Sequence, residues 1–431
     1  MSIKQIRSVI LIIALILIAG FTGYRLGQKN LQISTKNGQP EVTIDQKVPI
    51  GKENVDFSLF WNAWDRIESS YLDKSKIDKK KMVYGAIEGM VASLGDPYTV
   101  FLPPDEQKQS QEDLSGSFDG VGLQLGYKQS LITGGNKDSK LAVISPLSGT
   151  PAQKAGIKAG DLIVKIKDEK KKIDRDTVGI TLPEAVNIIR GPKGTSVTLT
   201  LVREGKTDPF DVKLTRGTIL VKSVELDIKD NIANLKLLRF GEKTDQEWDD
   251  AVKKIADGRK KGEIRGMVLD LRNNPGGFLQ GAIYVAGEFL ASGVVVKQEN
   301  AEGRGSQTFS VDRKGTLLDI PMVVLINEGS ASASEIVAGA LQDNKRARLV
   351  GVKTFGKGTI QEAQDLPGGS GLHITIARWL IPSGKWIDKE GIKPDIEVII
   401  QLAEDEKDSP RGEAGSTKDP QLDKALELLK K

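Results

Sequence analysis

The most informative segment of the chain is residues 326–336, which read Ile-Asn-Glu-Gly-Ser-Ala-Ser-Ala-Ser-Glu-Ile. An apolar run from Pro321 to Ile326, typical of a buried strand, precedes the small residues, and an apolar pattern from Ile336 to Leu341, typical of a helix, follows them. A tight turn between a buried strand and a helix can hold a serine hydroxyl in the open. The first N–H groups of the helix then point at whatever the serine attacks. The segment therefore predicts a strand–turn–helix unit that carries a candidate nucleophile.

Two simpler explanations compete with this interpretation. Ser332 and Glu335 have the spacing of a capping box, in which the serine oxygen accepts a hydrogen bond from the third helical N–H. Lys357 lies between Gly356 and Gly358, and taken alone it would indicate a solvated lysine in a turn. The serine turn and the glycine-flanked lysine together, in this order, favour a serine–lysine hydrolase.

The choice of lysine follows from the need for a base. A serine hydroxyl is a poor nucleophile until a base takes its proton. The single histidine, His373, lies in an alternating pattern typical of a strand, and we expect it to be an ordinary strand residue. Lysine has a pKa near 10.4 in water, and burial must lower it by about 3 units, on the order of 4 kcal/mol, to make a base. Phe355 and Ile360 could provide apolar cover for Lys357, and Gln361 could orient the amine without strongly stabilising ammonium.

Three motifs together carry a family resemblance. They are Gly-Ser-Ala-Ser-Ala-Ser-Glu at 329–335, Gly-Lys-Gly-Thr-Ile-Gln at 356–361 and Leu-Arg-Asn-Asn-Pro-Gly-Gly at 271–277. With them the chain resembles the carboxyl-terminal processing peptidases, which are tail-specific serine proteases with a PDZ domain, from about residue 56 to its end. The resemblance implies that Ser332 is the nucleophile, Lys357 the base and Gln361 its partner. The sequence alone does not separate Ser330 from Ser332.

Acyl transfer through a serine also needs preorganised N–H donors for the oxyanion. The N–H of Ala333 is a natural donor at the start of the helix. The second donor should come from the Pro275–Gly277 turn, where Gly276 or Gly277 permits a close approach of the backbone. The sequence leaves open which glycine is used, and the turn could also be a plain connection between a strand and a helix.

Residues 115–218 match the pattern of a PDZ domain. Gly120, Val121, Gly122 and Leu123 resemble the loop and strand that capture the carboxylate of a peptide and pair with it by β-addition. A glycine-rich hairpin without a ligand is the simpler alternative. Arg190 corresponds by motif to an arginine that links the position of the PDZ domain to protease activity in some relatives, although it could equally be an arginine in a surface ion pair.

The remaining chain supports a mixed α/β (α+β) protein. Strand-like and helical patterns alternate from about residue 219 to 400, which favours an α/β layer fold, and the resemblance implies a crotonase-like peptidase core. We expect these parts: a signal-anchor helix at 1–24, a stalk at 25–55, an N-terminal helical region at 56–114, the PDZ domain at 115–218, the peptidase core at 219–402, and a polar linker with a C-terminal helix at 403–431. The resemblance implies that the 56–114 region also supports dimer contacts.

The composition narrows the classes of function. The chain has 431 residues, 39% hydrophobic and 28% charged, so two or three domains are expected. Its formal charge of +4 is too small to argue for nucleic acid, and the absence of cysteine excludes disulfides, thiolate zinc sites and cysteine catalysis. The acidic residues have no metal-ligand spacing and the His-Glu-x-x-His motif is absent, so we expect neither metal nor cofactor.

The N-terminus predicts the compartment. Lys4 and Arg7 precede an uncharged run from Ser8 to Tyr24, which is typical of an export signal with its positive charge kept inside. The run is about as long as the shortest spanning helices and has no clear cleavage site after it, so we favour an uncleaved anchor over a removed signal peptide. This predicts a single-pass protein of the cell membrane with its catalytic domain outside the cytoplasm.

The sequence thus predicts a membrane-tethered serine endopeptidase that cleaves exported or membrane-associated proteins near their C-termini. The PDZ domain would recognise free C-terminal tails and gate activity, with the sign of its effect undecided. The alternatives are a non-catalytic PDZ scaffold at the membrane and, more remotely, a crotonase-like hydrolase of small thioesters.

Overall fold

The computed structural model describes residues 31–36, 39–44, 55–131, 137–301, 305–399 and 419–430, and it divides the chain into two compact units, 1–83 and 84–431. The first unit contains an antiparallel hairpin of β1 (Leu31–Lys36) and β2 (Gln39–Ile44), the helix α2 (Ser58–Ser70) and the short 3-10 helix η1 (Lys74–Lys76). The helix α3 (Lys79–Ala92) starts in the first unit and ends in the second.

The helix α2 buries none of its residues within the described chain. Its aromatic rings contact one another instead, with centroid distances of 5.0 Å between Phe60 and Trp61 and 6.0 Å between Phe60 and Trp64. No helix in the described part of the chain is both long enough and apolar enough to cross a bilayer. The anchor predicted at residues 1–24 lies outside the described residues.

Within the second unit, residues 117–220 form a closed module. Its sheet has the strand order β10-β9-β7-β6-β5, with β8 paired to β7. The strands are β5 (Leu123–Leu131), β6 (Lys137–Pro146), β7 (Leu162–Asp168), β8 (Ile173–Asp176), β9 (Ser196–Val202) and β10 (Phe210–Thr215), and the helices are α5 (Pro151–Lys154) and α6 (Leu182–Ile189). The chain enters through β4 (Ser117–Gly120) and leaves through β11 (Gly217–Leu220), which pair with each other, so the module is an insertion whose two ends meet.

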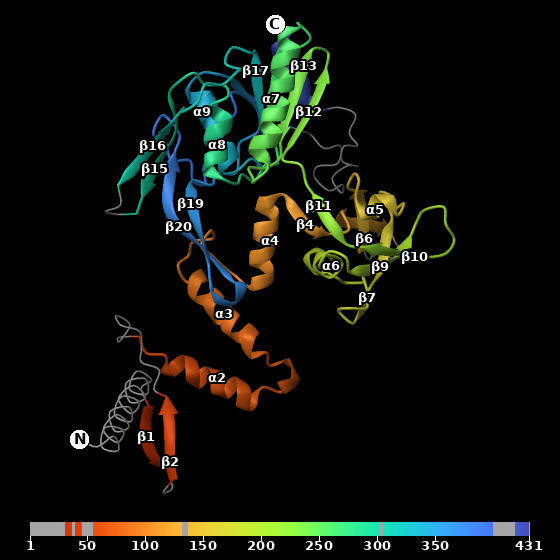
Figure 1. Cartoon of the computed structure of the whole chain (residues 1–431), viewed down its shortest axis with the longest axis vertical. Helices are drawn as coiled ribbons and strands as arrows, with labels where there is room; N and C mark the ends of the chain where they lie inside the picture. The colour runs from red at the N-terminus through yellow and green to blue at the C-terminus, as the bar shows by residue number, and fades with distance from the viewer. Residues whose placement is uncertain are drawn as a thin grey trace, which may run out of the picture. The chain divides into compact units, whose positions relative to one another are not determined.

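The core of the second unit is a sheet with the strand order β12-β13-β14-β17-β18-β21 (Figure 1). Its strands are β12 (Val224–Lys229), β13 (Ile232–Leu237), β14 (Gly266–Asp270), β17 (Met322–Ile326), β18 (Arg348–Gly351) and β21 (Ile396–Glu397). Every pair is parallel except β12 with β13. Both central strands, β14 and β17, are buried along their whole length.

Helices cover both faces of this sheet. The face that contains Leu269 and Val324 packs in one cluster with α7 (Thr244–Lys260), α8 (Leu279–Ala286) and α9 (Ala333–Asp343). The face that contains Val268 and Val323 packs against α10 (Pro420–Leu429). Burial on both faces explains why these strands read as continuous apolar runs rather than as alternating patterns.

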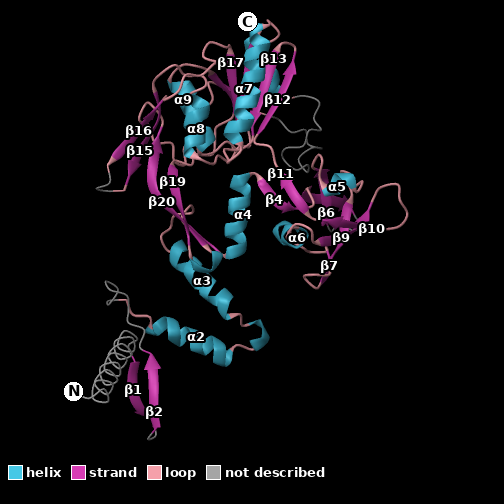
Figure 2. Cartoon of the chain, in the orientation of Figure 1, coloured by secondary structure: helices cyan, strands magenta, loops and turns pink. Residues whose placement is uncertain are grey.

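A second, antiparallel sheet has the order β16-β15-β20-β19, with β3 paired to β20 (Figure 2). Its strands are β3 (Val100–Leu102), β15 (Val294–Asn300), β16 (Ser306–Ser310), β19 (Thr359–Asp365) and β20 (Gly371–Leu380), with the 3-10 helix η2 (Pro367–Gly369) between the last two. The helix α4 (Pro104–Ser115) follows β3 and leads to the inserted module. The alternating pattern around His373 predicted part of β20 in this sheet.

Candidate active site

The topology of the core sheet brings three connecting segments to one edge. The strands β14, β17 and β18 are neighbours and run parallel, so their carboxyl ends lie side by side. Residues 271–278 follow β14, residues 327–332 follow β17 and residues 352–358 follow β18. These are the three segments in which the sequence placed the oxyanion turn, the serine and the lysine.

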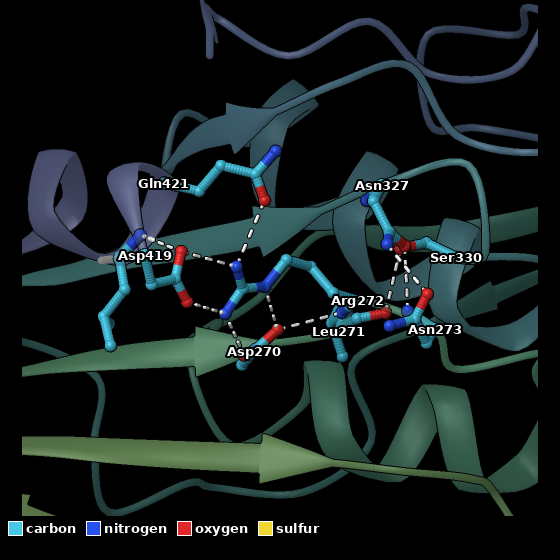
Figure 3. A network of polar contacts seen from close by, with 9 residues as sticks. Asp270, Leu271, Arg272, Asn273, Asn327, Ser330, Asp419 and Gln421 are labelled. Carbon is cyan, nitrogen blue, oxygen red and sulfur yellow. Dashed lines mark hydrogen bonds and ion pairs between the residues drawn. The ribbon is translucent and has the colours of Figure 1, made fainter. Parts of the chain in front are cut away.

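Side-chain hydrogen bonds lock the first two segments together (Figure 3). Asn273 donates its backbone N–H to Oδ1 of Asn327 at 2.8 Å, and Nδ2 of Asn327 donates to Oδ1 of Asn273 at 2.9 Å. Arg272 just before them donates to both carboxylate oxygens of Asp270 and to Asp419 at the start of α10. The turn after β14 is therefore hydrogen-bonded both to the turn after β17 and to the start of α10.

The structure separates the three serines of the turn. Ser330 is fully buried, and its hydroxyl donates to the carbonyl of Leu271 at 2.8 Å. Ser334 is also fully buried, and its hydroxyl donates to the carbonyl of Asn274 at 2.9 Å. Ser332 is half-buried and has the backbone angles φ 54° and ψ −115°, which a residue with a side chain rarely adopts. Its hydroxyl is the one of the three that is not used to hold the turn.

The capping-box interpretation of Ser332 is formed only in part. The carboxylate of Glu335 accepts the N–H of Ser332 at 2.8 Å, which is the reciprocal half of the box. The Ser332 oxygen faces the Glu335 N–H, but the contact falls short of hydrogen-bond geometry. A capping contact of this kind uses the serine oxygen as an acceptor, so the hydroxyl proton of Ser332 stays available to a base.

Glu335 links the serine turn to the lysine segment. It is fully buried and accepts hydrogen bonds from the Thr354 hydroxyl at 2.5 Å, the Gly356 N–H at 2.7 Å and the Lys357 N–H at 2.9 Å. Burial raises the pKa of Glu335 even though these donors favour its carboxylate. The N–H of Phe355 also donates to the carbonyl of Ser330 at 3.0 Å, so the two segments are joined at two points.

The amine of Lys357 is half-buried and makes no hydrogen bond or ion pair with the described residues, Ser332 included. Its Nζ lies 5.0 Å from the ring centroid of Tyr98. Burial lowers the pKa of Lys357, and the charges of Asp96 and Glu335 oppose this change without cancelling it. Burial thus shifts Lys357 towards the neutral amine that a base requires.

Gln361 and His373 lie on the neighbouring strands β19 and β20. Nε2 of Gln361 donates to the hydroxyls of Thr359 at 2.9 Å and Thr375 at 3.1 Å, which leaves its carbonyl oxygen as an acceptor. His373 is a strand residue, as the alternating pattern predicted, and burial together with the charge of Lys357 lowers its pKa.

The two candidate glycines of the oxyanion turn differ. A Cβ on Gly276 would lie 2.8 Å from Cβ of Ser332, so its backbone approaches the serine closely. The N–H of Gly276, however, donates to Oδ1 of Asn274 at 2.9 Å. The N–H groups of Gly277 and Ala333 have no such partner among the described residues. Gly277 has a φ of 139°, and a Cβ there would meet the carbonyl of Phe240 at 2.0 Å, so only glycine fits.

The residues picked from the PDZ pattern lie in the inserted module. Gly120 ends β4, Val121 packs in the core of the module, Gly122 has a φ of 77° and Leu123 begins β5. Arg190, at the end of α6, has its guanidinium carbon 4.2 Å from the ring centroid of Phe118. Its Nη1 lies 3.6 Å from Oε2 of Glu112 in α4.

The sequence interpretation missed Asp96 and Tyr98, which the structure brings to the lysine. No local pattern in the sequence signals this long-range contact. No cluster of residues suited to hold a metal occurs within the described ranges.

Comparisons with known proteins identify the family of the chain. Residues 231–398 match the model of peptidase family S41, residues 109–202 that of the PDZ domain, and residues 17–106 that of the activating protease CtpB N-terminal domain. The carboxy-terminal processing protease CtpA of Bacillus subtilis (strain 168) is 38% identical over 80% of this chain and 69% of its own length. The carboxy-terminal-processing protease of Bartonella bacilliformis is 40% identical over 80% of this chain and 75% of its own.

Among solved structures, a Bacteroides fragilis NCTC 9343 protein provisionally described as an S41 protease matches 85% of this chain and 96% of its own. It does so with a TM-score of 0.53 and 18% sequence identity, which shows a shared fold. The family matches and the two relatives show more than a shared fold. They show that the chain belongs to the carboxy-terminal processing proteases of peptidase family S41 and is a serine-type peptidase with a PDZ domain.

Proposed function

We propose that this protein is an endopeptidase with a Ser332–Lys357 dyad that cleaves exported or membrane-associated proteins near their C-termini. The single observation that carries the proposal is the joint attachment of both residues to Glu335. One carboxylate oxygen accepts the N–H of Ser332 and the N–H of Lys357, while Ser330 and Ser334 have their hydroxyls committed elsewhere. The lysine amine next to this carboxylate has its pKa lowered by burial.

The proposed reaction is acyl transfer in two steps. Lys357 takes the proton of Ser332 as Oγ attacks the peptide carbonyl, and then gives it to the leaving amine. Water releases the acyl group with Lys357 again as the base. In the resting structure the amine and the hydroxyl are not hydrogen-bonded, and such contacts are often loose before substrate binds. Gln361 can accept a hydrogen bond from the amine through its carbonyl oxygen and so orient it.

We propose Ala333 and Gly277 as the oxyanion donors. Both N–H groups lack a hydrogen-bond partner among the described residues, whereas the Gly276 N–H is occupied by Asn274. The absence of a side chain at Gly276 allows its backbone to lie against Ser332. Gly276 then allows the turn to pack closely against Ser332, and Gly277 donates its N–H to the oxyanion.

The PDZ domain, proposed to span residues 115–218, would hold the C-terminal tail of the substrate. The strand β5 stands at the end of its sheet, so its outer edge can pair with an extended peptide, and α6 lies beside it. The positive φ at Gly122 supports a carboxylate-binding loop before this strand. The contact of Arg190 with Glu112 offers a connection from the domain to α4.

The remaining parts of the proposal concern location and assembly. The charged and then apolar sequence of residues 1–24 supports a single-pass anchor with the catalytic domain outside the cytoplasm. The exposed aromatic residues of α2 support pairing of two copies through the N-terminal helical region. The helix-covered parallel sheet supports a crotonase-like description of the core.

Casein cleavage by the full chain tests the proposal. Ser332→Ala should abolish cleavage, and the matched variant Ser310→Ala, which changes an exposed serine of β16, should cleave as the wild type does. If Ser332→Ala and the wild type cleave equally, the dyad is wrong. If neither wild type nor variant cleaves casein or peptides with free C-termini, the alternative of a non-catalytic PDZ scaffold gains support.

A further inference from the structure

We infer that Asp96 and Tyr98 act with the dyad as positioning residues, stabilising the ammonium that forms on Lys357 when it takes the proton of Ser332. This inference rests on the proposed function, because it needs Lys357 to be the base. It adds a segment far upstream of the peptidase motifs to the site.

The fold brings this segment to the lysine through strand pairing. Residues 96–99 lead into β3, which pairs antiparallel with β20, so that Val100 lies opposite His373. On its other side β20 pairs with β19, the strand that carries Gln361. Thr99, directly before β3, is buried, and its hydroxyl takes part in two hydrogen bonds. These bonds hold the start of β3 in place.

A continuous chain of hydrogen bonds joins Asp96 to Gln361. The hydroxyl of Thr99 donates to Oδ2 of Asp96 at 2.6 Å and accepts the N–H of Thr375 at 3.0 Å. The hydroxyl of Thr375 in turn accepts from Nε2 of Gln361 at 3.1 Å. The N–H of Tyr98 also donates to Asp96, at 3.0 Å. Asp96 therefore fixes both Tyr98 and, through two threonines, the amide of Gln361.

Tyr98 presents its ring to the amine. The 5.0 Å between Nζ of Lys357 and the ring centroid is within the range of cation–π attraction, which acts on the ammonium and not on the neutral amine. Tyr98 stays neutral at working pH because burial, followed by the charges of Asp388, Glu335 and Asp96, raises its pKa. A neutral ring can stabilise a transient positive charge without taking the proton.

Nearby charges and burial have opposite effects on the protonation of the Lys357 amine. Asp96 and Glu335 favour the ammonium, while burial disfavours it. His373 faces the lysine from β20, and its lowered pKa keeps it neutral at working pH. Asp388 approaches from the segment before β21, where it accepts the Gly358 N–H at 3.2 Å. Burial raises the pKa of Asp96, but the hydrogen bonds from Thr375, Thr99 and Tyr98 together outweigh it, so the pKa of Asp96 is lowered.

The two effects act at different stages of the reaction. Burial lowers the pKa of the resting amine, and this pKa sets the pH above which Lys357 can act. Once the serine proton moves, the anion of Asp96 and the ring of Tyr98 stabilise the ammonium. The carboxylate of a serine–histidine–aspartate triad stabilises imidazolium in the same sense.

The test is the pH profile of kcat/KM for a peptide substrate, with variants of the full chain. Asp96→Asn removes the anion and favours the neutral amine, so the acidic limb should move to lower pH by about 0.5–1 unit while the plateau rate falls severalfold. Tyr98→Leu should move the limb in the same direction, and Tyr98→Phe, which keeps the ring, should leave it in place. Asp227→Asn, an exposed carboxylate on β12, is the control and should match the wild type.

A second measurement reads the lysine without turnover. In a Ser332→Ala background, the rate at which acetic anhydride labels Lys357, followed against pH by mass spectrometry, reports the pKa of the amine. Adding Asp96→Asn should lower this pKa.

The outcomes separate the inference from the proposed function. No shift, a shift to higher pH, or a higher plateau rate in Tyr98→Leu would overturn the inference, the last because it would mean that the ring holds the amine in an inactive position. Full activity in Ser332→Ala would instead overturn the proposed function.

Discussion

Ser332 and Lys357 donate their backbone N–H groups to the same atom, Oε2 of Glu335, at 2.8 Å and 2.9 Å. One buried carboxylate thus fixes the distance between the start of α9 and the segment after β18. The serine and the lysine are far apart in the sequence, and the parallel pairing of β17 with β18 brings their segments to the same edge. The carboxylate then sets how the two turns face each other.

Replacing Glu335 with glutamine should damage both stability and activity. The amide has one acceptor oxygen, whereas the carboxylate accepts three backbone N–H groups and the Thr354 hydroxyl. Leaving buried donors unsatisfied costs about 1–3 kcal/mol. Urea unfolding should show this loss, and kcat should fall more than KM rises, because the dyad is misplaced. An unchanged unfolding free energy would contradict the role given to this carboxylate.

Ser330→Ala and Ser332→Ala should have opposite effects. The Ser330 hydroxyl bridges the Leu271 carbonyl and the Asn327 N–H, so its loss should lower the unfolding free energy by about 1–3 kcal/mol and leave measurable turnover. Ser332→Ala should abolish turnover with little loss of stability, because the Ser332 oxygen makes only the loose capping contact with the Glu335 N–H. Thermal unfolding and peptide cleavage, measured on both variants, check this. Reversed results would mean that Ser330 is the nucleophile.

Lys357→Met should stabilise the protein at neutral pH. Burial lowers the pKa of Lys357, so the folded state holds the proton less tightly than the unfolded chain does. For a group of this kind, stability is fully present above the unfolded pKa of about 10.4 and is lost as the pH falls through the folded pKa. The advantage of the methionine variant should therefore shrink as the pH approaches 10. An advantage independent of pH would indicate better packing instead of a relieved charge.

The C-terminal helix should stabilise the turn after β14 through Arg272 (Figure 3). Arg272 pairs with the buried Asp270 and with Asp419, which is more exposed. Arg272→Ala leaves the buried Asp270 carboxylate without its partner and should lower the free energy of unfolding by about 3 kcal/mol or more. Asp419→Asn should lower it by about 1 kcal/mol. Equal losses in urea unfolding would show that the two pairs are alike, against this reasoning.

The sequence predicted those parts of the molecule whose signals are local. The apolar run of β17, the helical pattern of α9 and the C-terminal helix α10 follow from local periodicity, and the structure confirms them. The antiparallel sheet was mostly missed. Its strands β3, β15 and β19 are only partly buried. Both β3 and β15 pair with β20, which is distant from them in sequence.

The residues of the candidate site also divide into those with a local sequence signal and those without one. The serine turn, the lysine and the glycine turn could be picked out as motifs. The sequence could not rank Ser330 against Ser332 or Gly276 against Gly277, because the difference lies in hydrogen bonds to Leu271 and Asn274 across neighbouring strands. Asp96 and Tyr98 could not be found at all, since only the pairing of β3 with β20 brings them to Lys357.

Turnover by Lys357→Arg tests the general-base role most directly. Arginine keeps the positive charge and most of the length of the side chain but does not give up its proton in the range where proteins are folded. We expect a folded variant, with circular dichroism and thermal unfolding close to those of the wild type, that cleaves no peptide at any pH between 6 and 9 (roughly one to two units around the required base pKa). Cleavage at a rate near that of the wild type would contradict the proposal that a proton-free lysine activates Ser332.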